Sequence, residues 1–215
     1  TAEDVWTRLR LTLEAGNVSV AKHINRYLPK DQALNERKLD EATSNPLRYL
    51  DKHRHEINTR ADREVALYAL LRLLRSGTDQ AFAYWPKVRE RFSPAEQSYF
   101  LGHLASQAAR RLDPRALGWF RQAATTHPAT PLSDTQLAWQ TRAALRAGDW
   151  KTVLRSIEAM SAEEQQAGVW RYWKARALKT KGRITEANVL LAPLSSEHNF
   201  YGQLAEEEMG VVIGI

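Results

Sequence analysis

The chain has 215 residues, no cysteine and a formal net charge of +6. Without cysteine it can form neither disulfides nor cysteine-ligated metal sites. Ten glycines and eight prolines are few for this length, and their scarcity favours helices over a turn-rich β-sandwich. The longest apolar run is far shorter than the roughly 20 residues of a membrane-spanning helix, so we expect no membrane span.

The excess of positive charge is confined to the first 130 residues, whereas ten basic and ten acidic residues balance after that point. A mild basic excess is compatible with an anionic partner, such as nucleic acid or a carboxylate-bearing cell-wall polymer. Charges of this kind usually form a solvated helix face, and this is the interpretation that the sequence favours.

Apolar residues recur at helical spacing through the first half of the chain. They predict helices over residues 3–15, 18–28, 31–42, 47–55, 59–75, 79–91 and 93–111. The interior of the fifth helix, residues 65–71, is apolar nearly all round, so this helix must be covered on more than one side. The last helix starts with a capping box that has proline at the first helical position, Pro94.

The second half has the same character, with predicted helices over residues 115–125, 133–147, 149–160, 165–181, 184–194 and 197–209. Between the halves, residues 127–131 contain two prolines and are the best candidate for a hinge. Residues 211–215 do not fit the helical pattern, and a short strand and the root of a further region are both open interpretations. We expect one helical scaffold domain over residues 1–210.

A short pattern occurs twice at an offset of 34 residues. The first copy runs from Trp139 to Gly148 and the second from Trp173 to Gly182, with an arginine three positions after each tryptophan. A repeat of this length fits one helix, one turn and a returning helix, as in tetratricopeptide-type arrays. The sequence thus predicts an all-α fold, a right-handed α-superhelix or solenoid of antiparallel helix pairs.

Four residues of this region are candidates for ligand contact: Trp170, Tyr172, Arg176 and Tyr201. Aromatic faces can stack on sugar rings as well as on each other, and an arginine can bind a carboxylate through two parallel hydrogen bonds. The alternative is structural, because helical aromatics are usually buried and arginines bind the ends of neighbouring helices. The sequence favours core burial for the tryptophans and a structural role for Arg176.

No pattern for catalysis or cofactor binding occurs. The six histidines are dispersed and no His-Glu-x-x-His pattern is present, so we expect no metal site. A glycine-rich phosphate loop and a Gly-x-Ser-x-Gly elbow are also missing. Three glutamates stand together at residues 206–208, but consecutive helical residues point about 100° apart and do not form an acid–base pair. We expect no catalytic residue and no cofactor.

Three segments carry a family resemblance. They are Arg-Ala-Ala-Leu-Arg-Ala-Gly-Asp-Trp at residues 142–150, Trp-Arg-Tyr-Trp-Lys-Ala-Arg-Ala-Leu at residues 170–178, and Phe-Tyr-Gly-Gln-Leu-Ala-Glu-Glu-Glu-Met-Gly at residues 200–210. In this order and separation they resemble the end of the superhelical domain of the soluble lytic transglycosylases. Residues 1–138 are similar to that domain only in helical character and length.

The resemblance implies a bacterial periplasmic protein that acts on peptidoglycan. Enzymes of this family cleave the bond between N-acetylmuramic acid and N-acetylglucosamine and leave a 1,6-anhydro end. One glutamate serves first as acid and then as base, for which a pKa raised by burial is useful. In the family that glutamate lies in a separate lysozyme-like domain, directly before a serine, and a Gly-Leu-Met-Gln motif follows it. Neither pattern occurs in this sequence.

We therefore expect residues 1–210 to be the non-catalytic scaffold of such an enzyme, inactive alone, with the lysozyme-like catalytic domain outside this chain. The expected partners are peptidoglycan glycan strands and docked cell-wall enzymes. One alternative stays open, a helical-repeat scaffold for protein–protein interactions unrelated to the cell wall. A helical nucleic-acid binder is the least supported hypothesis because only the net charge suggests it, and we expect no nucleic-acid partner.

Overall fold

The computed structural model describes residues 1–210, so the interpretations of the tail at 211–215 lie outside the described residues. Within residues 1–210 all regular structure is helical. The chain divides into two compact units: unit 1 comprises residues 1–107 and 122–130, and unit 2 comprises residues 108–121 and the chain from Pro131 onward. The boundary at residue 130 falls where the sequence predicts a hinge, and hinge motion stays a prediction.

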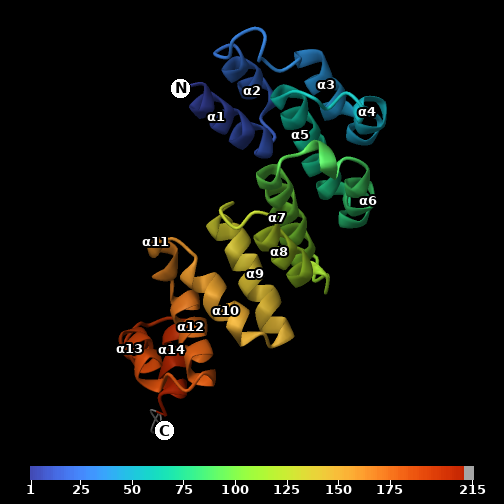
Figure 1. The fold of residues 1–215 in the computed structure, drawn as a ribbon. Coiled ribbons are helices and arrows are strands. Elements are labelled where there is room, and N and C mark those ends of the chain that lie inside the picture. The colour runs from blue at the N-terminus through green and yellow to red at the C-terminus, as the bar shows by residue number, and fades with distance from the viewer. Residues whose placement is uncertain (211–215) are drawn as a thin grey trace. The chain divides into compact units, whose positions relative to one another are not determined.

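Unit 1 is a succession of short helices (Figure 1). Its elements are α1 (Ala2–Glu14), α2 (Val18–Asn25), α3 (Glu36–Ser44), α4 (Pro46–His53), α5 (Arg60–Ser76), α6 (Thr78–Tyr84), η1 (Trp85–Lys87), η2 (Arg89–Arg91), most of α7 (Pro94–Arg110) and the end of α8 (Ala116–Thr126). Helix α5 is buried along most of its length, since α1, α3, α4 and α6 all pack against it. The predicted cover on several sides of α5 is confirmed.

Two predicted helices of unit 1 differ most from their bounds in the structure. The third begins at Glu36, later than predicted, because the side chain of Asn35 accepts a hydrogen bond from the N–H of Lys38 and caps the helix there. The helix predicted over residues 79–91 gives way after Tyr84 to two 3-10 turns. Pro86 explains this break, because proline has no N–H to donate and its ring crowds the preceding turn.

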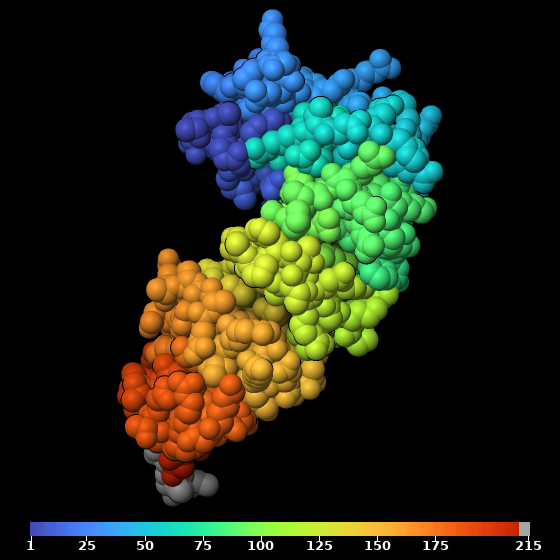
Figure 2. Space-filling model, in the orientation of Figure 1, coloured from blue at the N-terminus to red at the C-terminus, as the bar shows by residue number. Residues whose placement is uncertain are grey.

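Unit 2 contains α9 (Asp134–Ala147), α10 (Trp150–Glu158), α11 (Ala162–Gln165), α12 (Gly168–Thr180), α13 (Ile184–Ser195) and α14 (Phe200–Glu208), with the last turn of α7 and the start of α8. Helices near one another along the chain pack together: α9 on α10, α10 on α12, α12 on α13 and α13 on α14. In Figure 2 the orange and red helices form one continuous packed body. Trp170, Ile157 and Leu191 are among the fully buried side chains of its core.

Four helices end in the same hydrogen-bonded turn, in which a residue with positive φ precedes one whose N–H bonds to the carbonyl five residues back. The positive-φ residues are Gly16, Leu112, Gly148 and Gly182. Glycine is favoured at such positions because it lacks the Cβ that strains a left-handed conformation. Leu112, with a φ of 60°, is therefore exceptional among the described residues. The prediction that Gly148 and Gly182 end the repeat helices is confirmed.

Candidate ligand-binding surface of unit 2

The start of α14 is held by a cap and a close backbone contact. The side chain of Asn199 accepts a hydrogen bond of 3.0 Å from the N–H of Gly202, which caps the helix. Gly202 packs so tightly on the preceding turn that a Cβ atom there would overlap the backbone carbonyl of Glu197. Only glycine fits this contact, and the contact fixes Phe200 and Tyr201 at the first turn of α14.

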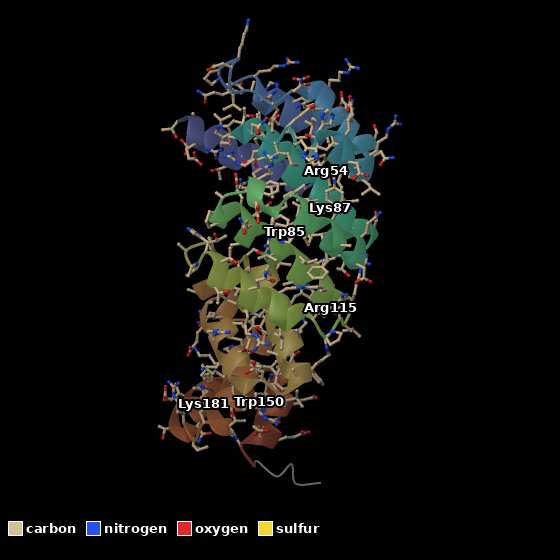
Figure 3. All side chains as sticks on the ribbon, turned by 45° about the vertical axis from the view of Figure 1, so that its right-hand side comes forward. Arg54, Trp85, Lys87, Arg115, Trp150 and Lys181 are labelled. Atoms are coloured by element: carbon tan, nitrogen blue, oxygen red, sulfur yellow. The ribbon has the colours of Figure 1, made fainter. Side chains whose placement is uncertain are left out.

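Five aromatic side chains form a continuous row across α14, α12 and α10, which we call the aromatic row. Its members are, in order, Phe200, Tyr201, Tyr172, Trp173 and Trp150, and successive ring centres lie 5.2, 6.0, 5.2 and 6.4 Å apart. Phe200 at one end is 64% exposed, whereas Tyr172 in the middle is buried. Trp150 at the other end, labelled in Figure 3, is partly buried at the start of α10. Trp173 and Tyr201 are also partly buried, so every ring of the row except that of Tyr172 keeps surface that a ligand can reach.

Arg176 is held by its neighbours on α12 and α14. Its Nη1 donates to the hydroxyl of Tyr172 at 3.0 Å and lies 3.5 Å from a carboxylate oxygen of Glu208. The hydrogen bond to Tyr172 is the main cause that raises the pKa of Arg176. Lys179 also binds Glu208, at 3.3 Å. The Arg176 guanidinium is thus neutralised within the chain, in line with the structural role that the sequence favours.

The structure brings three of the four candidate residues together and separates the fourth. Tyr172 adjoins both Arg176 and Tyr201, as the distances above show. Trp170 is only 2% exposed, and its Nε1–H donates to Glu164 at 2.7 Å. Core burial of Trp170, the interpretation favoured by the sequence, is confirmed. Its ring is closed to ligands, so a ligand-contact role for Trp170 has no structural support.

Sequence reasoning missed Arg142, the repeat counterpart of Arg176. The Arg142 guanidinium lies over two indole rings, 4.8 Å from the ring centre of Trp139 and 5.2 Å from that of Trp170. Arg142 is exposed, and within residues 1–210 it makes no ion pair. The signal was present in the repeat itself, because arginine stands three positions after tryptophan in both copies, but the sequence does not show which of the two arginines is neutralised.

The clearly shifted carboxyl groups of residues 1–210 bear on whether this chain could supply a general acid. Where the pKa of a described carboxyl group is clearly shifted, it is lowered, as in Glu197, whose pKa is held down chiefly by its hydrogen bond from Arg171. The same direction holds for Glu14, where a hydrogen bond from His103 is the main cause. A general acid working near neutral pH needs the opposite shift. The prediction that no catalytic residue lies in this chain remains a prediction.

Two further findings concern metal ions and membranes. Among residues 1–210, no group of three or more acidic or histidine side chains is arranged to hold a metal ion. None of the described helices is long and apolar enough to cross a membrane.

The fold is similar to that of two solved lytic transglycosylases. The structure of an inactive mutant of the lytic transglycosylase Slt from Pseudomonas aeruginosa matches 98% of this chain and 34% of that chain, with a TM-score of 0.68 and 28% identity. The 70-kDa soluble lytic transglycosylase from Escherichia coli matches 94% of this chain and 33% of that chain, with a TM-score of 0.66 and 22% identity. The predicted all-α fold class is confirmed, while the handedness of the superhelix stays a prediction.

The amino-acid sequence points to the same proteins. The chain is 25% identical over 209 residues to the soluble lytic murein transglycosylase of Escherichia coli (strain K12). The match covers 94% of this chain but 31% of that protein, so the chain spans about a third of the length of the curated relatives it matches. No protein-family model matches the chain. The predicted resemblance to the soluble lytic transglycosylases is confirmed by both comparisons.

Proposed function

We propose that the chain is the helical, non-catalytic part of a peptidoglycan-degrading lytic transglycosylase of the bacterial periplasm. The observation that carries the proposal is the likeness to the lytic transglycosylase of Pseudomonas aeruginosa over 98% of the chain at 28% identity. The lowered carboxyl pKa values of the described residues add support, since they disfavour a general acid here. Cleavage of the glycosidic bond is then the task of a lysozyme-like domain outside these residues.

In this role the aromatic row contacts the glycan strand. Phe200 and Tyr201 offer ring surface at one end of the row, and Trp150 and Trp173 offer it at the other. Tyr172 is buried and Arg176 is bound to it, so these two residues position the row. A flat aromatic face suits the apolar face of a sugar ring, because stacking removes both from water without leaving a polar group unsatisfied.

Sedimentation with purified murein sacculi tests the proposal. The purified chain should sediment with sacculi, and it should release no 1,6-anhydro products. Phe200→Ala should weaken the binding because it removes the most exposed ring of the row, whereas Tyr27→Ala, which removes a 69% exposed ring from unit 1, should leave it unchanged.

Release of 1,6-anhydro products by the chain alone would contradict the non-catalytic assignment. Failure to sediment with sacculi would contradict the role in peptidoglycan binding and would favour the alternative, a helical scaffold for protein–protein interactions. Equal binding by the wild type and Phe200→Ala would remove the aromatic row from the proposal and leave the rest intact.

A further inference from the structure

We propose that Arg110, Trp139, Arg142 and Arg146 of unit 2, together with the small pocket beside Leu112, form a binding site for an acidic peptide. The arginines hold a carboxylate of the peptide, and the pocket takes an adjoining small apolar side chain. This inference rests on the proposed function only for the source of the peptide, the stem peptides of peptidoglycan. The site lies apart from the aromatic row in its residues and in its chemistry.

The arginines are oriented by stacking on an indole. Trp139 on α9 has the guanidinium of Arg142 at 4.8 Å from its ring centre and that of Arg110, the last residue of α7, at 5.5 Å. A guanidinium stacked on an aromatic face keeps its N–H groups directed outward at the edge, where they can bind a planar anion. Trp139 thus limits the conformations of the Arg110 and Arg142 side chains before a ligand binds.

Arg146 completes the cluster from the same helix as Arg142. Residues four apart lie on the same face of a helix, which places Arg146 beside Arg142 on α9. Arg146 donates to the backbone carbonyl of Ala109 at 3.5 Å, a long hydrogen bond that engages one nitrogen of its fork. The cluster therefore joins the end of α7 to the outer face of α9.

The cluster carries three positive charges without a carboxylate to neutralise them. Among residues 1–210, Arg110, Arg142 and Arg146 form no ion pair, although all three are exposed. Other arginines of unit 2 are neutralised: Arg171 binds Glu197 at 2.7 Å and Arg183 binds Glu186 at 2.6 Å. Arg110 and Arg142 share the Trp139 ring, and Arg146 lies one turn from Arg142 on α9, so a bound anion supplies the negative charge that the described residues do not place there.

A pocket of about 200 Å³ adjoins Arg146. Its apolar lining comes from the turn after α7, from the start of α8 and from α9: Leu112, Pro114, Ala116, Leu117, Ala143 and Ala147. The volume is well below that of sites for drug-sized ligands, roughly 300–1,000 Å³, and suits a short aliphatic side chain. Asp113 also borders the pocket, but its carboxylate is bound by Arg115 at 2.6 Å.

Leu112 carries two unfavourable features that its own chain does not compensate. It holds a left-handed conformation where the equivalent turns have glycine, and its side chain is 64% exposed. Strained residues of this kind concentrate at functional sites. An apolar side chain of a ligand that covers Leu112 removes apolar surface from water on both partners. A glycine at this position has no side chain to contribute to that burial.

A carboxylate-bearing peptide matches this combination better than a nucleic acid does. The planar carboxylate fits the arginine fork through two parallel hydrogen bonds, and the pocket accepts a methyl-sized group beside it. Peptidoglycan stem peptides offer both features, since they combine free carboxylates with alanine methyl groups. A glycan without peptide offers neither feature and should not bind here.

Titration calorimetry with a soluble alanine- and glutamate-containing stem tripeptide tests the site. The wild-type chain should bind this peptide, and binding should weaken as salt is raised. The double variant Arg142→Gln/Arg146→Gln should bind at least about tenfold more weakly, because it loses charged hydrogen bonds to the carboxylate of the peptide. Arg121→Gln removes one positive charge from an exposed arginine of the same unit and should bind like the wild type.

Two further probes separate the proposal from its competitors. The tripeptide with its carboxylates amidated should lose binding, and inorganic phosphate should compete weakly if at all. Absent tripeptide binding, or equal loss in the double variant and in Arg121→Gln, would overturn the site. Phosphate binding as tight as the peptide's would overturn the peptide assignment. Sedimentation with sacculi is a separate measurement. Absent tripeptide binding therefore leaves the proposed function unchanged, and a failure to sediment with sacculi leaves the calorimetric result unchanged.

Discussion

Arg10 on α1 and Glu64 on α5 form a two-point ion pair, with nitrogen–oxygen distances of 2.9 and 2.6 Å. The Glu64 side chain is almost completely buried, and Arg60 reaches the same carboxylate only at 3.8 Å. Arg10 also lies 3.9 Å from Glu96 on α7. One arginine thus connects three helices of unit 1 through two carboxylates.

Arg10→Ala should destabilise unit 1 by about 3 kcal/mol, because removal of one partner leaves a buried charge uncompensated. Hydrogen exchange of the α1 and α5 amides together with urea unfolding would measure the loss. Arg8→Ala removes an exposed arginine from the same helix and should change stability by no more than about 0.5 kcal/mol. Similar unfolding midpoints for the two variants would show that the Arg10–Glu64 pair contributes little.

Gly202→Ala should destabilise the end of unit 2 by about 2 kcal/mol, since a methyl group there overlaps the Glu197 carbonyl and forces the backbone apart. Gly118→Ala is the matched control, because Gly118 is a helical glycine of α8 with open space around its Cβ position. That variant should gain roughly 0.5–1 kcal/mol from higher helix propensity. Thermal unfolding of both would contradict this account if the two shifts had the same sign.

Leu112→Gly should stabilise the chain by about 0.5 kcal/mol. Relief of the left-handed strain contributes roughly 1–2 kcal/mol, and the greater freedom of glycine in the unfolded chain offsets about 0.4–1 kcal/mol of it. Gly148→Ala makes the reverse change at the equivalent turn, with a φ of 67°, and should destabilise by about 1 kcal/mol. A melting temperature lowered by Leu112→Gly would mean that, without a ligand, the contacts of the leucine side chain stabilise the fold by more than its left-handed backbone conformation destabilises it.

Glu41 on α3 makes unit 1 sensitive to acid. Its carboxylate lies 3.0 Å from Nε2 of His53 and 3.1 Å from Nζ of Lys52, both on α4. These hydrogen bonds, with that of His53 the stronger cause, lower the pKa of Glu41 from its ordinary 4.5 to about 2. A carboxyl group whose pKa is lowered by folding stabilises the fold above the unfolded pKa, and this contribution is lost as the pH falls from about 4.5 toward 2.

The protection of the α3 and α4 amides against exchange, relative to the unfolded chain at the same pH, should therefore fall between pH 4.5 and pH 2. In Glu41→Gln the change with pH should be smaller, because the titrating group is gone. Glu36→Gln, at the exposed start of α3, serves as the control and should follow the wild-type pH profile. A Glu41→Gln profile that coincides with the wild type would assign the acid sensitivity to other carboxyl groups.

Local signals in the sequence predicted most helices and their ends. Gly148 and Gly182 were found from the repeat, and α5 was recognised as a covered helix from its apolar interior, because both features depend on neighbours in the chain. Pro86 marked the break after α6, although the sequence analysis did not use it. Helix bounds depend on caps such as Asn35, whose hydrogen bond to Lys38 is visible only in the structure.

The candidate site was harder to predict because it depends on long-range pairing. The repeat makes Arg142 and Arg176 equivalent in sequence, yet only Arg176 meets a carboxylate, that of Glu208 from another helix. Likewise, the repeat does not reveal that Arg110, from the end of α7, reaches Trp139. Periodicity identifies the helix face of a residue, but the charge of its tertiary neighbour is a property of the assembled fold.

The packing of consecutive helices in unit 2 has a kinetic consequence. Because α9, α10, α12, α13 and α14 pack mainly on helices that are adjacent or one apart along the chain, the contacts that stabilise the unit close short loops. Low contact order of this kind gives rapid folding, and ordering that starts at one helix pair can spread to the adjacent pair without waiting for distant segments to meet. Loss of α14 should accordingly loosen α13 first and leave α9 and α10 paired.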